Sequence, residues 1–189
     1  MVTQSPVLFR LRLALRAIAG GGVIACPTEA VWGLSCDPHN RSAVQRLLAL
    51  KGRSPAKGLI LVAATEQQLE FLLARLDPQQ RRTLSDSWPG PSTWLVPHHG
   101  RVPAWIHGEH ATVAVRVSAH PVVTALCSGW GAPLVSTSAN PSGSRPVRQA
   151  YQVKRYFGDE LDYLLPGQVG SSGRPTEIRD LASGRIIRS

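Results

Sequence analysis

The amino-acid sequence predicts an α/β fold in one domain, with an open, twisted sheet of mixed strand direction flanked by helices. Short apolar runs alternate along the chain with segments of helical periodicity, as expected when helices pack on a sheet. Polar clusters follow several of the apolar runs, where open α/β sheets bind ligands. Some connections, such as residues 28–30, are too short for a parallel crossover. Some neighbouring strands should therefore be antiparallel.

The first expected element is an amphipathic helix near the N-terminus. Leu8, Leu11, Leu15 and Ile18 recur on one helical face, and the glycines at 20–22 end the pattern. We therefore expect a helix packed on the core, although the arginines around it also resemble an organellar presequence.

The remaining elements are predicted in the same way along the chain. Short apolar or alternating runs between turn residues predict strands; they lie at 23–26, 31–34, 59–63, 93–96, 112–117 and 134–135, with two short candidates near Tyr163 and Ile178. Apolar residues spaced by three or four, together with cap residues, predict helices; they lie at 42–51 (N-cap Ser42), 65–76 (N-cap Thr65), 78–87, 121–127 and 149–157. Residues 98–109 are predicted to be irregular.

Length and composition favour one globular unit. The chain has 189 residues, of which 43% are hydrophobic and 17% charged, which excludes intrinsic disorder. No linker or repeat divides it, so we expect residues 1–189 to form a single domain. Its three cysteines have neither disulfide nor zinc-ligand spacing, and no apolar run is long enough for a membrane span. We therefore expect a soluble, cytoplasmic protein.

The charge balance favours an anionic partner. Lys and Arg number 21 against 12 Asp and Glu, a net charge of +9, which suits a nucleotide or RNA. Phosphate-loop, dinucleotide-binding and nucleophile-elbow motifs are absent from the sequence, which argues against the common kinases, dehydrogenases and hydrolases. The histidines at 98–99, His107 and His110 lie among Gly and Pro, and we interpret them as a solvated loop and expect no metal bound by protein ligands.

Two polar clusters are candidates for an anion site. Lys51 and Arg53 are one residue apart at the end of a predicted helix, where they suit a polyphosphate or simply a solvated helix end. Residues 136–143 concentrate hydroxyl and amide groups after a buried strand, which suits a ligand at the sheet or a hydrogen-bonded turn.

Two smaller features have similar alternatives. Thr28 and Glu29 stand at a strand end, where they orient a small polar ligand or close a turn. Arg116 has apolar neighbours and needs an acceptor, because an unpaired buried charge is costly. That acceptor is either a ligand carboxylate or a structural ion pair.

Five segments in order resemble the YrdC family across essentially the whole chain. They are Cys26-Pro27-Thr28-Glu29-Ala30-Val31-Trp32-Gly33-Leu34, Lys51-x-Arg53, Pro89-Gly90-Pro91-Ser92-Thr93, Val113-Ala114-Val115-Arg116-Val117 and Ser136-Thr137-Ser138-Ala139-Asn140. The length resembles the bacterial single-domain TsaC type. Ala30, Lys57-Gly58-Leu59 and Thr176 depart from residues common in relatives, although Thr176 keeps a hydroxyl group.

The resemblance implies a nucleotidyltransferase that forms threonylcarbamoyl-AMP and pyrophosphate from L-threonine, bicarbonate and ATP, with Mg²⁺ bridging phosphates. Its product would feed the tRNA threonylcarbamoyl-transferase machinery. By the same likeness, the ATP-facing residues are Lys51, Arg53, Thr112, Ser138, Asn140 and Arg188, with Lys51 and Arg53 as the catalytic pair. The threonine-facing residues are Thr28, Arg116, Ser136 and Thr176.

Two other functions remain open from the sequence. A basic surface of this charge suits double-stranded RNA or tRNA through phosphate contacts. A carbamoyl-transferring domain like that of hydrogenase maturation would share the fold and use carbamoyl phosphate. Threonine-dependent release of pyrophosphate from ATP distinguishes the synthase from both.

Overall fold

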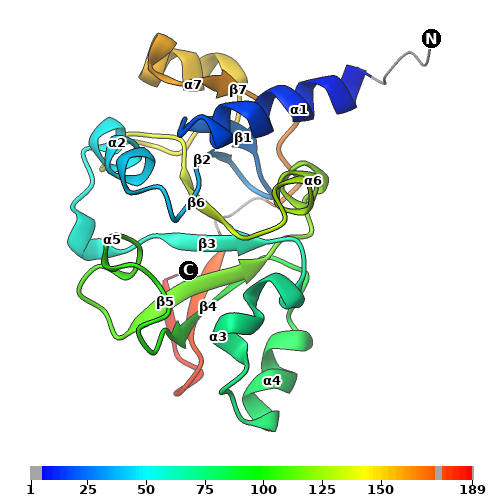
Figure 1. Cartoon of the computed structure of the whole chain (residues 1–189), viewed down its shortest axis with the longest axis vertical. Coiled ribbons are helices and arrows are strands. Elements are labelled where there is room, and N and C mark those ends of the chain that lie inside the picture. Colours follow the sequence, from blue (N-terminus) through cyan, green and yellow to red (C-terminus); the bar gives the residue numbers. More distant parts are fainter. Residues whose placement is uncertain (1–5, 173–175, 189) are drawn as a thin grey trace.

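The computed structural model describes residues 6–172 and 176–188, and its centre is one mixed sheet (Figure 1). The strand order is β7-β1-β2-β6-β3-β5-β4-β8-β9. The strands are β1 (Ile24–Pro27), β2 (Trp32–Ser35), β3 (Ile60–Ala63), β4 (Ser92–Pro97), β5 (Thr112–Val117), β6 (Leu134–Ser138), β7 (Tyr163–Leu164), β8 (Glu177–Asp180) and β9 (Ile186–Arg188). The predicted α/β class with a mixed open sheet is confirmed.

Both strand directions occur within this sheet. β1 and β2 are antiparallel, joined through the short turn that the sequence indicated. The pairs β1/β7, β3/β5 and β4/β8 are parallel, while β6 runs antiparallel to both of its neighbours, β2 and β3.

Helices cover both faces of the sheet. They are α1 (Pro6–Ala19), α2 (Arg41–Lys51), α3 (Glu70–Leu73), α4 (Pro78–Ser85), α5 (Ala104–His107), α6 (Pro121–Trp130) and α7 (Ala150–Phe157), with short 3₁₀ turns at Pro55–Lys57, Glu66–Leu69 and Gly158–Glu160. α1 and α6 pack together on one face, where Ala14, Ile18 and Leu126 form a core with strand residues such as Ile24. The other helices contribute to a larger core that contains Trp32 and Leu47.

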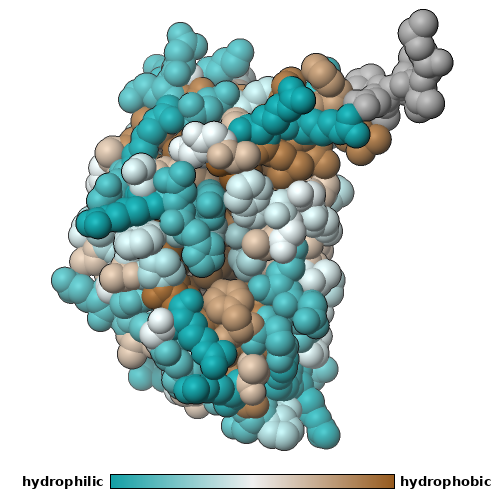
Figure 2. All heavy atoms as spheres, viewed as in Figure 1, coloured by the Kyte–Doolittle hydropathy of each residue, from teal (hydrophilic) through white to brown (hydrophobic). Residues whose placement is uncertain are grey.

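The first helix differs from its predicted packing. Leu8 is 52% exposed, and the buried positions of α1 are Ala14 and Ile18. Figure 1 shows the reason, since the N-terminal turns of α1 project beyond the sheet. Val7 and Phe9 are also exposed there, and Figure 2 shows hydrophobic side chains gathered around this helix.

Three local predictions are corrected by the structure. The N-cap of α2 is Asn40, whose side chain accepts from the backbone N–H of Ala43, and not Ser42. Thr65 makes no side-chain cap bond, and its predicted helix is divided into a 3₁₀ turn and the short α3. The segment 98–109, predicted to be irregular, contains α5, because Ile106 is an apolar anchor that is fully buried.

The strand β6 is longer than predicted. Residues 136–138 were assigned to a polar loop, but they continue the strand, pairing with β3 at Ser136 and with β2 at Thr137 and Ser138. Two neighbours supply backbone partners, and this overrides the weak strand preference of a polar sequence.

β9 was not predicted. Among the described residues, no helix combines the length and apolarity needed to cross a membrane.

Candidate active site

A cavity of about 550 Å³ lies over the middle of the sheet. Its floor includes Leu95, Ala114, Ile60 and Ser136, which are cross-strand neighbours on β4, β5, β3 and β6. The walls come from the β1–β2 turn, the end of α2, α5, the loop after β6 and the β8–β9 segment. The volume suits a ligand of nucleotide size.

The cavity gathers all ten side chains that the sequence singled out as ATP- or threonine-facing. Thr28, Lys51, Arg53, Thr112, Arg116, Ser136, Ser138, Asn140, Thr176 and Arg188 all line it. They are brought together from six separate parts of the chain. The cavity also extends over the interior of the strands and is not confined to their ends, since Ala114 and Ile60 form part of its floor.

One side of the cavity is strongly cationic. Lys51, Arg53, Lys57 and Arg188 line it together, and no acidic side chain lines it among the described residues. Burial lowers the pKa of the Arg53 guanidinium, and the charge of Arg188 lowers it further. The guanidinium nevertheless stays charged. Closely spaced cations without a carboxylate among them create a site for a polyanion.

Lys51 differs from the solvated helix end that was one sequence interpretation. It is only 3% exposed, and its ammonium group donates to the backbone carbonyls of Ser138 and Asn140, the latter at 2.6 Å. The helix ends at Gly52 in the left-handed conformation, and the N–H of Ser142 donates to the Lys51 carbonyl at 2.7 Å. Lys51 therefore fixes the loop after β6 as well as lining the cavity.

The loop after β6 presents a free acceptor at the same site. Asn140 is buried, and its Nδ2 donates to the carbonyls of Pro141 at 2.9 Å and Ser144 at 2.7 Å. These two acceptors fix the orientation of the amide, leaving Oδ1 buried without a hydrogen-bond partner. A buried, unpaired acceptor that lines a cavity is costly unless a ligand satisfies it.

The other side of the cavity carries hydroxyl groups and Arg116. Thr28 closes the β1–β2 turn by donating to the Val31 carbonyl at 2.7 Å, and it lines the cavity as well. The hydroxyl oxygens of Thr176 and Thr93 are 3.3 Å apart. The sequence offered ligand and turn as alternatives for Thr28; the turn is confirmed, and the role toward a ligand stays a prediction.

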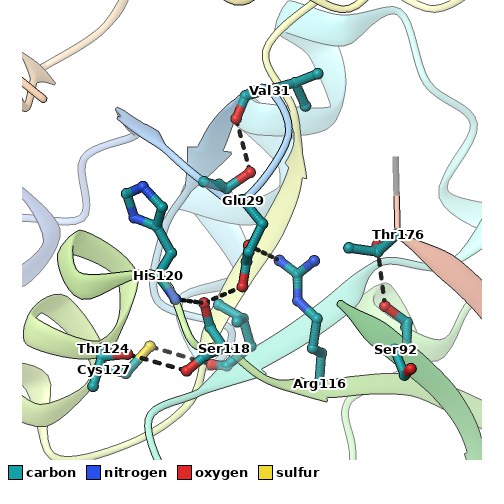
Figure 3. Close-up of polar contacts among 12 residues, drawn as sticks. Glu29, Val31, Ser92, Arg116, Ser118, His120, Thr124, Cys127 and Thr176 are labelled. Atoms are coloured by element: carbon teal, nitrogen blue, oxygen red, sulfur yellow. Dashed lines mark hydrogen bonds and ion pairs between the residues drawn. The ribbon is translucent and has the colours of Figure 1, made fainter. Parts of the chain in front are cut away.

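For Arg116 the structural ion pair is confirmed, and the pairing with a ligand carboxylate stays a prediction. Arg116 is 5% exposed and lines the cavity, while its Nη2 lies 3.3 Å from Oε2 of Glu29. Burial lowers the pKa of this guanidinium and the Glu29 carboxylate raises it again. Arg116 thus forms a structural ion pair (Figure 3), and it also lines the cavity.

Sequence reasoning missed several residues that line the cavity. His107 and His110 come from the segment described as a solvated loop, and Ile178 and Ile187 come from the C-terminal strands. The position of His107 depends on α5 packing beside the Pro55–Lys57 turn, and that of the two isoleucines depends on the pairing of β8 with β4 and of β9 with β8. These are tertiary contacts with no local signal. Among the described residues, no group of three or more His, Cys, Asp or Glu could hold a metal ion.

The cysteines do not supply a nucleophile. Cys26, Cys36 and Cys127 are free and buried. Burial raises the pKa of each thiol to about 12. Because the thiolate is the reactive form, burial disfavours nucleophilic attack by these thiols.

Arg148 is tied to the backbone around the site. Its guanidinium donates to the carbonyls of Ala30 at 2.7 Å, Ser172 at 3.0 Å and Gly170 at 3.2 Å. These bonds join the β1–β2 turn to the segment that precedes Thr176. Arg148 is therefore a structural residue of the site's wall.

We expect Arg148→Ala to lower stability by about 1–2 kcal/mol, because charge-assisted hydrogen bonds are lost at a partly solvated position. Thermal denaturation should then show a melting temperature several degrees lower. Arg82→Ala is the matched control, since Arg82 is exposed and its side chain makes no hydrogen bond or ion pair with the described residues. Equal melting temperatures for the two variants would contradict the assignment.

The fold and the site define an α/β protein whose cavity is cationic on one side and carries hydroxyl groups on the other. A family model for Sua5, YciO and YrdC proteins, described as "Telomere recombination", matches residues 16–189. The chain belongs to the Sua5/YciO/YrdC family.

Relatives match this chain in sequence or structure over nearly its whole length. A protein of Halorhodospira halophila named threonylcarbamoyl-AMP synthase is 55% identical over 180 residues, covering 95% of this chain and 94% of that protein. The structure of P. abyssi Sua5 complexed with L-threonine superposes with a TM-score of 0.87 at 31% identity, covering 94% of this chain and 52% of that one. E. coli YciO shares the fold, with a TM-score of 0.86 at 23% identity, covering 98% of this chain and 91% of that one.

Proposed function

We propose that this chain is an L-threonylcarbamoyladenylate synthase, in which residues 1–189 form one domain of the family. The amine of L-threonine takes up bicarbonate with loss of water, giving a carbamate. A carbamate oxygen then attacks the α-phosphorus of ATP; a new P–O bond forms, the bond to the β-phosphate breaks, and pyrophosphate leaves. Relatives that are 50–55% identical carry the name of this activity.

The supporting observation is that one cavity holds a cationic side and a hydroxyl side next to each other. On the cationic side, Lys51, Arg53 and Arg188 neutralise the polyphosphate, with Thr112, Ser138 and Asn140 around the nucleotide. On the other side, Arg116 pairs with the threonine carboxylate, and the hydroxyls of Thr28, Ser136 and Thr176 surround the amino acid. Such a site works by positioning and by stabilising charge, so no protein nucleophile is required.

Mg²⁺ fits this site through few protein ligands. The buried and unpartnered Oδ1 of Asn140 is the kind of oxygen ligand that Mg²⁺ accepts, while phosphates and water would complete its coordination. When bound, the ion would neutralise phosphate charge. The chain's own residues position the two substrates, and Lys51 and Arg53 form the proposed catalytic pair.

The test is pyrophosphate release from ATP by the purified chain. We expect release only when threonine and bicarbonate are both present, with threonylcarbamoyl-AMP as the nucleotide product by mass spectrometry. Carbamoyl phosphate should not replace threonine and bicarbonate. Turnover with carbamoyl phosphate alone would favour the carbamoyl-transfer alternative.

We further propose that the product is used by the tRNA threonylcarbamoyl-transferase machinery in the cytoplasm. The three free cysteines are compatible with a reducing compartment. The net charge of +9 also suits tRNA or double-stranded RNA as a further partner.

The threonine side should discriminate only modestly against serine. The two amino acids differ by one methyl group, and one methyl in a pocket contributes about 1–3 kcal/mol. We expect kcat/KM for threonine to exceed that for serine by roughly 10–200-fold. Equal values would contradict an apolar subsite for the methyl group.

ATP binding should weaken above neutral pH. Burial, assisted by the charge of Arg53, lowers the pKa of Lys51 to about 8, so the ammonium is charged below that pH and loses its proton as the pH rises through it. The attraction to phosphate then decreases. Titration with a non-hydrolysable ATP analogue without threonine, between pH 7 and 9, should show a rising Kd, and a constant Kd would contradict the role of the ammonium.

A further inference from the structure

We infer that Glu29, held by Ser118, is a positioning residue that orients Arg116 toward the carboxylate of the amino-acid substrate. This inference rests on the proposed function, because it names what controls the threonine side of the same cavity. Neither Glu29 nor Ser118 lines that cavity. They lie behind Arg116 and act through it.

The two carboxylate oxygens of Glu29 contact different partners: one accepts a hydrogen bond from Ser118, and the other forms an ion pair with Arg116 without a hydrogen bond. Oε1 accepts from the Ser118 hydroxyl at 2.5 Å, and Oε2 lies 3.3 Å from Nη2 of Arg116. The Glu29 side chain is only 11% exposed and that of Arg116 only 6%. Figure 3 shows the carboxylate between the two partners, with the guanidinium end of Arg116 beside it. The position of the arginine therefore depends on a buried carboxylate.

Ser118 is itself fixed so that its hydroxyl hydrogen is directed to Glu29. The backbone N–H of His120 donates to the Ser118 oxygen at 3.1 Å. The backbone of Ser118 is bonded too: its N–H donates to the Ala63 carbonyl, and its carbonyl accepts from the Thr124 hydroxyl. Ser118 is 1% exposed. Because a carboxylate only accepts hydrogen bonds, the Ser118 hydroxyl serves it as a donor while its oxygen accepts from His120.

The backbone of Glu29 is held equally closely. A Cβ on Gly170 would lie 2.6 Å from the Glu29 carbonyl oxygen, so only glycine allows this approach. Ser172 donates from its N–H to the same carbonyl at 3.2 Å. Arg148 then ties Gly170 and Ser172 to Ala30, the residue after Glu29. Both ends of the glutamate are thus fixed relative to the cavity.

Arg116 needs this support because its own bonding is incomplete. Its Nε is buried and has no hydrogen-bond partner, so the guanidinium keeps donors for a ligand. Without Glu29, a buried guanidinium would lose its counter-charge and its fixed orientation. A carboxylate ligand is bound best by a guanidinium held in one plane.

The test compares Glu29→Gln and Ser118→Ala with Glu70→Gln. Glu29→Gln keeps size and removes charge; Ser118→Ala keeps both charges and removes only the bond that orients the carboxylate. Glu70→Gln is the matched control, because Glu70 pairs with Arg81 away from the cavity. Calorimetry measures binding of threonine and of threoninamide, which lacks the carboxylate, and steady-state kinetics gives KM for threonine and for ATP.

We expect Glu29→Gln to raise Kd and KM for threonine at least tenfold and Ser118→Ala to raise them about threefold, since a lost hydrogen bond is worth about 0.5–1.5 kcal/mol. KM for ATP should stay within twofold in both variants, and the preference for threonine over threoninamide should fall. Glu70→Gln should match the wild type in every measurement.

Three results would overturn the inference: threonine binding that is unchanged or tighter, equal losses for threonine and ATP, or an unchanged preference over threoninamide. If Glu29→Gln does not fold, Ser118→Ala decides by the same criteria. A wild-type chain that binds no threonine would contradict the proposed function and this inference together. If the wild type binds threonine and the Glu29 and Ser118 variants bind it equally well, the inference alone is contradicted.

Discussion

Arg53→Ala is expected to reduce threonylcarbamoyl-AMP formation by about 10²–10³-fold, the usual cost of removing one group that stabilises charge in the transition state. Arg53 lines the cavity, and within residues 6–172 and 176–188 its side chain donates only to the backbone carbonyls of Lys57 and Gly58. Its loss should therefore change stability little. Pyrophosphate release measures the first effect, and thermal denaturation measures the second.

Lys51→Ala should reduce activity by a similar factor but should also destabilise the fold. Lys51 is buried and holds the carbonyls of Ser138 and Asn140, so its removal leaves two acceptors without their donor. A lower melting temperature for Lys51→Ala than for Arg53→Ala separates the two roles. Full activity in Arg53→Ala would show that the phosphate site is misplaced.

The sequence predicted the strands well where the hydrophobic pattern was local. β5 was predicted at 112–117 and is found with those bounds, because alternation with a buried face is a direct signal. β6 was shortened to two residues because the sequence Ser-Thr-Ser is typical of a loop. Its pairing with strands on both sides is a tertiary effect that the local pattern does not contain.

The residues of the candidate site were predicted from the family resemblance more than from residue type. Lys51 shows why residue type alone was insufficient. A lysine in the last turn of a helix is usually solvated, but here residues 138–142 cover it. The pairing of Glu29 with Arg116 joins residues that are far apart in the sequence, and the sequence named only the need for an acceptor. Which acceptor satisfies Arg116 is decided by the sheet, which brings the β1–β2 turn beside the end of β5.

Arg116→Met is expected to abolish threonine-dependent pyrophosphate release and to lower stability by about 3–5 kcal/mol, because it leaves the buried carboxylate of Glu29 without its counter-charge. The double variant Glu29→Gln with Arg116→Met removes both charges. It should recover most of the lost stability, since replacing both members of a buried pair is far less costly than removing one. Its activity should remain absent, because no guanidinium is left for the threonine carboxylate.

Chemical denaturation of the wild type, the two single variants and the double variant gives the coupling energy of the pair. Pyrophosphate release from the same four proteins gives the functional effect. Recovery of activity together with stability in the double variant would mean that Arg116 serves only the fold. Loss of activity that persists in a stable double variant assigns Arg116 to the substrate and Glu29 to Arg116.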